Sequence, residues 1–258
     1  MHYTHMRPRA FTKRRLECPV AYLPLGILEW HGFHNPLGLD GIKAEKVLSH
    51  LAGKLGGVVL PTLYWGDNRE DVVDVICDPA VSSFPPPNAG DHVTGICEAM
   101  ALSRSRLEEE ARRSRQNGGW RLWEELVVHT LFQSESLGFD LIVVYPGHYP
   151  MHGPMDRAVD AFSSGGGRAR VFVLKDHLVA RGDHAAAFET SLLLALAPDL
   201  VDLAELSATD AMHLGVVGDD PLRHASAEYG LSIVAKFERI VAAQIALAGP
   251  ARVLRAGN

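Results

Sequence analysis

The sequence predicts an α/β fold in which helices cover both faces of a mainly parallel β-sheet. Short apolar runs bounded by Gly and Pro alternate along the chain with longer segments whose apolar residues have helical spacing. Strands of a parallel sheet bury both faces, so they read as continuous apolar runs. With 258 residues and 47% hydrophobic content, the chain is also long and apolar enough to enclose a packed core.

Four apolar runs are predicted to be the buried strands. They are VAYLPLG (20–26), GVVLP (57–61), DLIVVYPG (140–147) and ARVFVL (169–174). The segments with helical spacing are GIKAEKVLSHLAGKL (41–55), WRLWEELVVHTLFQSESLG (120–138), PMDRAVDAF (154–162), HAAAFETSLLLALAP (184–198) and SAEYGLSIVAKFERIVAAQIALA (226–248). Strands that alternate with helices in this way are typical of a parallel sheet covered on both sides.

We expect residues 1–258 to form a single domain, because the sequence contains neither an internal repeat nor a linker long enough to divide it. The least regular stretch lies at about residues 85–120. It contains the Pro-rich run SSFPPPNAGDHVTG and the charge-rich run ALSRSRLEEEARRSRQNGG. A surface excursion followed by a solvated helix is one interpretation, and an insertion that forms a lid or a subunit contact is the other.

The charge balance and the cysteines narrow the class of protein. Thirty-one acidic and 25 basic residues give a net charge of −6, which favours neither nucleic acid nor an anionic membrane as a partner. The basic N-terminal segment is followed by LECPVAYLPLG, too short and too interrupted for a signal peptide or a membrane span, so we expect a cytoplasmic protein. Cys18, Cys77 and Cys97 have no CxxC pairing, so any metal ligands should be His, Asp or Glu.

Ionisable residues gather after the predicted strands. Glu29, His31 and Asp40 lie in LEWHGFHNPLGLD, and His148 lies in YPGHYPMHG. In parallel sheets, ligand sites form beyond the carboxyl ends of the strands. Glu29 and His31 are two apart and point the same way if the segment is extended. Carboxylates and imidazoles together suit zinc, manganese or ferrous iron, and an Asp can bridge two ions.

Local structure offers another explanation for each of these residues. Asp40 could cap the helix that follows it, and Glu29 and His31 could form an ion pair or hydrogen bonds within their loop. His148 could be a structural residue of a turn, and His184 could lie in the first turn of the helix predicted after it. The residues taken singly leave both explanations open.

Four segments together resemble the motifs of the creatininase family, the creatinine amidohydrolases. The family pattern LPxGxxEQHGPHLPLxxD is matched by LPLGILEWHGFHNPLGLD, and NGHGGN or NGHYEN is matched by YPGHYPM. HAGxxETSxxL is matched by HAAAFETSLLL, and a GVxGDP-type segment followed by AxxG is matched by GVVGDDPLRHASAEYG. The motifs occur in family order from about residue 20 to residue 245, and residues 85–120 are not covered well.

The resemblance implies a three-layer α/β/α sandwich, often assembled as a homo-oligomer such as a hexamer, with two divalent ions per chain. Those ions, zinc, manganese or iron, serve to hydrolyse an amide-like C–N bond of a small molecule. By position, Glu29, Asp40 and His148 would hold one ion. His31 and the bridging Asp40 would hold the second, with a shared water as the nucleophile.

Aligning the family motifs with this sequence also implies a catalytic residue. The same alignment indicates that one metal ligand of creatininase is missing here. His184 matches the family histidine near the substrate, suited to accept and return a proton. Pro150 stands where creatininase has the Glu of NGHYEN, and proline cannot bind a metal through its side chain. We therefore expect Glu189, or less favourably His152, to complete the second ion site. Because His184 and Glu189 are five apart, they converge only if His184 precedes the helix.

The predicted substrate pocket departs from creatininase. Tyr149 matches a residue that lines the pocket there, but Trp30 replaces the usual Gln, and Ala180 and Arg181 replace a Trp-Asp pair. Arg181 would suit a carboxylate or phosphate on the substrate, although it could also be a solvated surface residue.

We therefore predict a metal-dependent amidohydrolase that acts on a small cyclic amide, a formamide or a peptide-like bond, with creatinine not the favoured substrate. Trp30, Tyr149 and Arg181 are the predicted substrate-binding residues. The main alternative is a non-catalytic metal-binding or scaffold protein with a degenerate second metal site, and a mononuclear lyase or isomerase is a further one.

Overall fold

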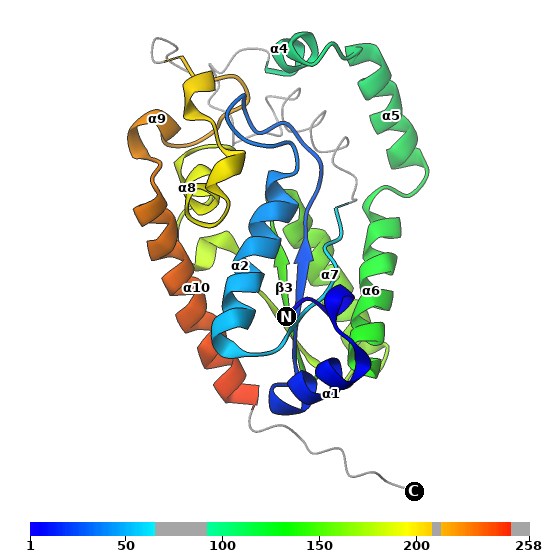
Figure 1. Cartoon of the computed structure of the whole chain (residues 1–258). Coiled ribbons are helices and arrows are strands. Elements are labelled where there is room, and N and C mark those ends of the chain that lie inside the picture. The colour runs from blue at the N-terminus through cyan, green and yellow to red at the C-terminus, as the bar shows by residue number, and fades with distance from the viewer. Residues whose placement is uncertain (65–91, 208–212, 249–258) are drawn as a thin grey trace, which may run out of the picture.

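The computed structural model describes residues 1–64, 92–207 and 213–248, and its centre is a parallel β-sheet (Figure 1). Within the described part of the chain the sheet has four strands in the order β2-β1-β3-β4. They are β1 (Val20–Leu25), β2 (Val58–Val59), β3 (Leu141–Pro146) and β4 (Arg170–Val173). Each neighbouring pair is parallel, with Tyr22 opposite Val143 in the central pair. The predicted parallel sheet is confirmed.

The five helices predicted from the spacing of apolar residues are present, with small shifts at their ends, and the helices at 8–17, 92–99 and 221–224 were not predicted. In chain order the described helices are α1 (Pro8–Glu17), α2 (Leu39–Leu55), α4 (His92–Ala99), α5 (Arg104–Gln116), α6 (Trp120–Ser136), α7 (His152–Ser164), α8 (Ala187–Leu196), α9 (Pro221–His224) and α10 (Ala227–Ala248). Short 3-10 turns are η1 (Tyr3–His5), η3 (Tyr149–Met151), η4 (Asp176–Leu178), η5 (Pro198–Leu200) and η6 (Leu203–Glu205). The largest correction concerns α8, which begins at Ala187 instead of at His184.

Two separate cores lie on the two faces of the sheet. Successive side chains of a strand point to opposite faces. Along β3, Val143 packs with α2, α8 and α10, whereas Ile142 and Val144 pack with α6 and α7. Figure 1 shows these two groups of helices on opposite sides of the strands. The predicted three-layer α/β/α sandwich is therefore confirmed.

Two glycines let the start of α2 lie directly against the ends of the central strands. A Cβ atom on Gly26, just after β1, would lie 2.2 Å from the main-chain nitrogen of Gly41. A Cβ atom on Gly147, just after β3, would lie 2.1 Å from the main-chain oxygen of Asp40. Only glycine fits backbones this close together. The contact places Asp40 at the carboxyl ends of β1 and β3, where ligand sites form in such sheets.

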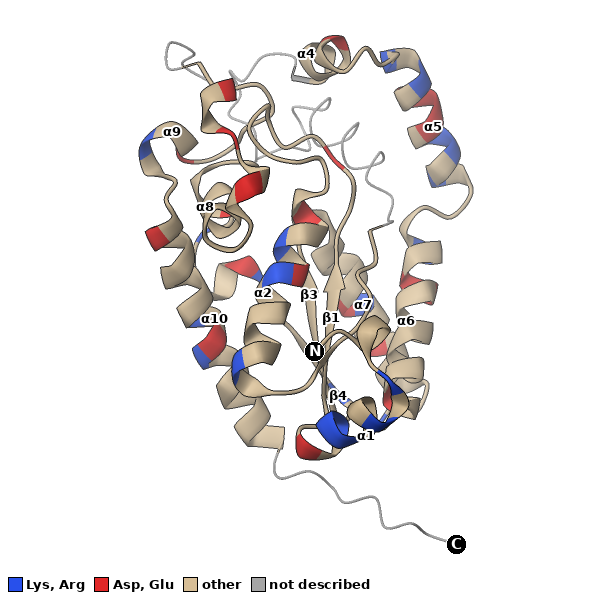
Figure 2. Cartoon of the chain, viewed as in Figure 1, with Lys and Arg blue, Asp and Glu red and all other residues tan. Residues whose placement is uncertain are grey.

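The described part of the region predicted as an insertion or lid consists of α4 and α5. Figure 1 shows both helices at the end of the molecule toward which β1 and β3 point. Ser103 caps α5 by accepting a hydrogen bond from the main-chain nitrogen of Arg106, and Ala111 is buried in it. Acidic and basic residues are interspersed along α5 (Figure 2). Residues 85–91 lie outside the described residues, and a lid in this region stays a prediction.

The cysteines that the structure describes, Cys18 and Cys97, form no disulfide bond, and Cys77 lies outside the described residues. None of the helices described is long and apolar enough to cross a lipid bilayer.

Candidate metal centre

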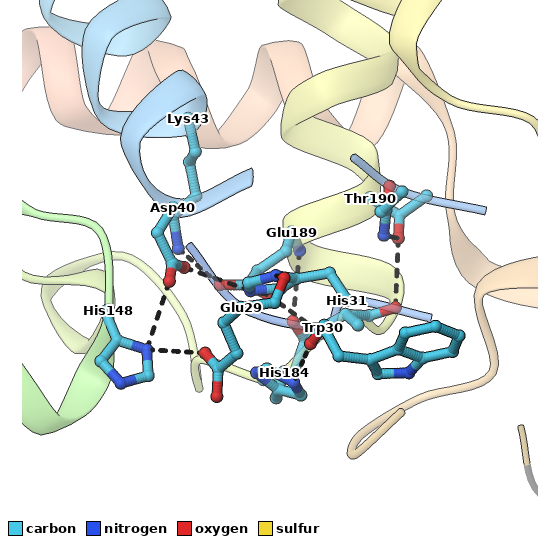
Figure 3. A network of polar contacts seen from close by, with 12 residues as sticks. Glu29, Trp30, His31, Asp40, Lys43, His148, His184, Glu189 and Thr190 are labelled. Atoms are coloured by element: carbon cyan, nitrogen blue, oxygen red, sulfur yellow. Dashed lines mark hydrogen bonds and ion pairs between the residues drawn. The ribbon is translucent and has the colours of Figure 1, made fainter. Parts of the chain in front are cut away.

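Ionisable side chains from four parts of the chain meet beyond the ends of the central strands (Figure 3). Three groups of carboxylates and imidazoles have ligand atoms within 4.8 Å of one another: Glu29, Asp40 and His148; His31, Asp40 and Glu189; and Glu29, His31 and His184. The loop after β1, the start of α2, the end of β3 and the start of α8 supply them. The sequence-predicted metal ligands and the predicted catalytic histidine thus lie in one place.

Asp40 joins the first two groups through its two carboxylate oxygens. Its Oδ1 lies 3.3 Å from Nε2 of His31, and its Oδ2 lies 3.2 Å from Nδ1 of His148. The N-cap residue of α2 is Gly38, and Asp40 lies inside the helix. The alternative that Asp40 caps this helix is therefore wrong. Its two oxygens face two different histidines.

The first group, Glu29 with Asp40 and His148, is compact. Nδ1 of His148 lies 3.1 Å from Oε2 of Glu29. His31, from the second group, has its Nδ1 3.1 Å from the main-chain oxygen of Glu29. Nδ1 of His31 therefore donates to that carbonyl, and its Nε2 is left facing Asp40 and, 3.9 Å away, Oε2 of Glu189. This orientation presents one ring nitrogen of each histidine to the carboxylates.

The hydrogen bonding of the buried ligand atoms indicates whether these residues suit a metal. Oε2 of Glu29, Nε2 of His31 and Oδ2 of Asp40 are buried and have ion-pair contacts of 3.1–3.3 Å but no well-aligned hydrogen bond. Leaving such atoms unsatisfied costs free energy. A divalent ion would satisfy them, and mixed carboxylate and imidazole ligands suit zinc, manganese or iron. The residues present therefore fit a metal ion.

Without an ion, protonated imidazoles balance the buried carboxylates. Burial lowers the pKa of His148, but Glu29 and Asp40 outweigh it and raise that pKa to about 10. Burial likewise lowers the pKa of His31, whereas Asp40 and Glu189 raise it to about 9. Burial would raise the pKa of Asp40, but the two histidines hold it well below its usual range. A metal would take the place of these protons, because ligating histidines are neutral.

A buried lysine next to Glu189 is the main feature that the sequence did not reveal. Nζ of Lys43, on α2, lies 2.6 Å from Oε1 of Glu189 and 3.2 Å from Oδ2 of Asp176. The hydroxyl of Tyr145 donates to the other oxygen of Asp176. Burial lowers the pKa of Lys43, but Asp176 and Glu189 outweigh this and raise it well above its usual value.

One sequence signal could have pointed to Lys43. It lies three residues after Asp40 and four before the buried Val47, and residues at such spacings share one face of a helix. A lysine on the buried face of a helix needs a charged partner. The partners themselves, Glu189 and Asp176, could not be identified from spacing.

His184 lies in the segment before α8, as its convergence with Glu189 requires. Its main chain pairs with Val217, with hydrogen bonds of 2.9 and 2.8 Å. The N-cap residue of α8 is Ala186, and the carboxylate of Asp183, three residues earlier, accepts a hydrogen bond from the main-chain nitrogen of Phe188 at 2.7 Å. The alternative that His184 lies in the first turn of the helix is wrong. Its Nε2 lies 3.0 Å from the main-chain oxygen of Trp30.

The predicted substrate residues differ in what they contact. Nε1 of Trp30 donates to the main-chain oxygen of Leu214 at 3.0 Å. Tyr149 follows His148 directly, is 69% exposed and has its ring 5.1 Å from that of His152. Arg181 is exposed. His152, the less favoured candidate for the second ion site, belongs to none of the three ligand groups found among the described residues.

Comparisons with known proteins agree with the fold. The family model described as creatininase, creatinine amidohydrolase, matches residues 4–76 and 121–243. No curated protein matches the chain. A Trp-to-Phe mutant of creatininase is 21% identical, with a TM-score of 0.64, and the match covers 96% of this chain and 99% of the other.

Two further creatininase structures have similar values, and both matches cover 96% of this chain and 98% of the other. A Glu-to-Gln mutant of the Zn-Zn type is 22% identical with a TM-score of 0.61. A manganese form is 21% identical with a TM-score of 0.61. At these identities the structures show that the chain shares their fold.

Proposed function

Because the chain belongs to the creatininase family, we propose that it is a metal-dependent amidohydrolase acting on a small molecule. The single observation that carries this proposal is the position of Asp40, whose two oxygens face two different groups of candidate ligands. This arrangement supports a centre for two divalent ions. Zinc, manganese and iron all suit its carboxylates and imidazoles, and similar creatininase structures are described as Zn-Zn and manganese forms.

We assign each ion its ligands from the two groups that share Asp40. Glu29, Asp40 and His148 would hold the first ion, and His31, Asp40 and Glu189 would hold the second. When bound, the ions lower the pKa of a water toward neutrality and polarise the carbonyl group of an amide. The glycines that bring α2 against the ends of the strands keep the shared carboxylate in place between the two groups.

His184 would move the proton during hydrolysis. Its Nε2 carries a hydrogen and donates to the main-chain oxygen of Trp30, so in the neutral ring Nδ1 keeps the lone pair. Burial lowers the pKa of His184, although Glu29 opposes this, and the ring is therefore neutral and able to accept a proton near pH 7. It would take that proton from water and return it to the leaving nitrogen.

The exposed residues beside the centre would select the substrate. We propose that Tyr149 and Arg181 line the pocket and that Trp30 shapes its edge, since the indole N–H of Trp30 is already bound to Leu214. Arg181 would favour a substrate that carries a carboxylate or phosphate. A small cyclic amide, a formamide or a peptide-like bond of this kind is a better candidate than creatinine. We further propose that the protein acts in the cytoplasm as a homo-oligomer, such as a hexamer.

A non-catalytic metal-binding or scaffold protein is the second candidate. Pro150, in η3, offers no ligand at the position where creatininase has a Glu, and Lys43 already binds one oxygen of Glu189. Both features weaken the second ion site. In this alternative the first ion, or the protonated histidines alone, would stabilise the fold without supporting hydrolysis.

Metal analysis of protein purified without chelator tests the proposal. We expect two equivalents of metal per chain, and a value near zero for Asp40→Ala because that change removes the shared ligand. Asp160→Ala, an exposed carboxylate on α7, is the matched control and should keep both ions. A folded wild-type chain that binds no divalent ion would rule out the hydrolase.

Hydrolysis assays then separate the two candidate functions. The metal-loaded chain would be given creatinine, other cyclic amides, formamides and short peptides, each with and without an acidic group. A chain that holds two ions and hydrolyses none of them would support the scaffold. Equal activity on creatinine and on the acidic amides would refute the role given to Arg181.

A further inference from the structure

Lys43 places a fixed positive charge in direct contact with Glu189, which belongs to one of the two groups, and at a greater distance from the shared Asp40. Its side chain is fully buried, and its Nζ lies 2.6 Å from Oε1 of Glu189. Figure 3 shows Lys43 on α2, one helical turn from Asp40, with Glu189 close to both. Burying a lysine is costly unless it is paired, so its pairing here with Glu189 and Asp176 keeps it charged and in place.

The ammonium group limits what Glu189 can offer to an ion. Oε1 is bound to Lys43, and Oε2 accepts a hydrogen bond from the main-chain nitrogen of Ala185 at 2.7 Å. Oε2 is also the oxygen that faces His31, 3.9 Å from its Nε2. Glu189 can therefore contribute one oxygen to an ion, and that oxygen belongs to a carboxylate whose charge is already shared with a cation.

The other group is different. Oε2 of Glu29 lies 3.1 Å from Nδ1 of His148, which is itself a candidate ligand. A ligating histidine is neutral, so this contact leaves no fixed positive charge beside a bound ion. Lys43 cannot be replaced by the ion in this way, because its ammonium stays beside Glu189 after an ion has bound.

We propose that Lys43 is a positioning residue that makes the two ion sites unequal, with the site of His31, Asp40 and Glu189 the weaker one. The inference rests on the proposed two-ion centre. A fixed positive charge a few ångströms from a bound cation repels it, and the repulsion is strong in a buried, low-dielectric environment. The ion at Glu29, Asp40 and His148 is farther from this charge and binds first.

Asp176 partly neutralises the positive charge of Lys43 and so reduces its repulsion of the second ion. It binds the same ammonium through Oδ2, and the hydroxyl of Tyr145 holds its other oxygen. If the charge of Asp176 is removed, the ammonium acts on Glu189 alone and the second ion should bind more weakly. If the charge of Lys43 is removed, Glu189 is free and the second ion should bind more tightly. The two changes thus have opposite expected signs.

Calorimetric titration of the chelator-treated full chain with Mn²⁺ measures both affinities. For the wild type we expect two binding events, the second about tenfold weaker than the first or more. Lys43→Met should tighten the second event by about tenfold and leave the first nearly unchanged. Asp176→Asn should weaken the second event. Lys175→Met, which removes a neighbouring lysine bound to Asp156, is the matched control and should change neither.

Lys43→Met leaves two buried carboxylates without their cation, so its folding must be checked by thermal unfolding. If it does not fold, the double variant Lys43→Met/Asp176→Asn removes both charges of a pair and should fold. It should also bind the second Mn²⁺ more tightly than the wild type does. If Lys43 were purely structural, these variants would have a changed unfolding temperature, but the affinity of the second Mn²⁺ would not change relative to that of the first.

The outcomes distinguish this inference from the function on which it rests. Two events of equal affinity in the wild type would overturn the role of Lys43 and leave the two-ion centre intact. The role of Lys43 would also be overturned if Lys43→Met or the double variant weakened the second binding event or left it unchanged. A wild-type chain that binds no Mn²⁺ at all would overturn the metal centre and this inference together.

Discussion

The ring of His184 is held by the main chain of Trp30, whose carbonyl oxygen lies 3.0 Å from Nε2. The indole of Trp30 is in turn bound to the main-chain oxygen of Leu214, also at 3.0 Å. Leu214 lies three residues before Val217, which pairs with the main chain of His184. Three segments that are far apart in the sequence therefore close a ring of contacts around the proposed catalytic imidazole.

Trp30→Phe should loosen this ring of contacts. The change removes the N–H that binds the main-chain oxygen of Leu214 and leaves this partly buried carbonyl without that hydrogen bond, which costs about 1 kcal/mol of folding free energy. We expect faster hydrogen exchange in the peptides that contain His184 and Val217, measured by mass spectrometry, with little change in metal content. Phe33→Leu is the control, because it removes the ring packed 4.9 Å from Trp30 but keeps the hydrogen bond. Equal exchange rates in Trp30→Phe and wild type would contradict this role.

Changes to the two histidines that face Asp40 should each remove one ion. His148→Asn takes a ligand from the group with Glu29, and His31→Asn takes one from the group with Glu189. Each variant should therefore keep close to one equivalent of metal, measured by elemental analysis after dialysis. Loss of all metal in both variants, with the fold intact, would instead indicate a single ion shared by both histidines.

Much of the fold and the candidate site follows from local sequence signals. Apolar runs gave the four strands because parallel strands are buried on both faces. The site followed from the rule that polar residues after parallel strands meet at one edge of the sheet. Glu29, Asp40 and His148 come together for this reason, since β1 and β3 are neighbours in the sheet. The resemblance to a family then ordered these residues into two groups.

The remaining features depend on contacts between distant segments, which spacing does not encode. The pairing of His184 with Val217 is one example, and the pairing of Lys43 with Asp176 is another. The predicted strand at 57–61 is also longer than the observed β2, which pairs with β1 over only Val58 and Val59. Pro61 has no main-chain N–H to donate, and beyond it the segment pairs with β1 only through an isolated bridge between Leu63 and Leu25.

Gly147→Ala should disturb the centre through the backbone. The added Cβ would lie 2.1 Å from the main-chain oxygen of Asp40, so the start of α2 would have to move away from β3. We expect a loss of about 2 kcal/mol or more in folding free energy and a lower metal content. Gly153→Ala in α7 is the control, because its Cβ would meet only the end of Arg157 at 3.6 Å. Normal metal content in Gly147→Ala would show that Asp40 tolerates the shift.

His34 should make the metal-free protein less stable in mild acid. It is buried, and its Nε2 accepts a hydrogen bond from Nδ2 of Asn35 at 3.0 Å. A proton on Nε2 would face this N–H, although Oγ1 of Thr190 also lies 3.1 Å from Nε2. Burial lowers the pKa of His34 to about 4, whereas in the unfolded chain it is close to 6.5. On acidification the unfolded chain binds the proton first, so stability is complete above about pH 6.5 and falls toward pH 4.

Urea unfolding of chelator-treated protein at pH 7 and pH 5 measures this effect. From the two pKa values, the wild type should lose up to about 2 kcal/mol through His34 over this interval. Other groups also titrate there, so the comparison is with His34→Gln, whose free energy of unfolding should fall less. His129→Gln, at an exposed position on α6, should keep the wild-type slope. If His34→Gln and wild type lose the same free energy between the two pH values, His34 is not the group that carries this acid sensitivity.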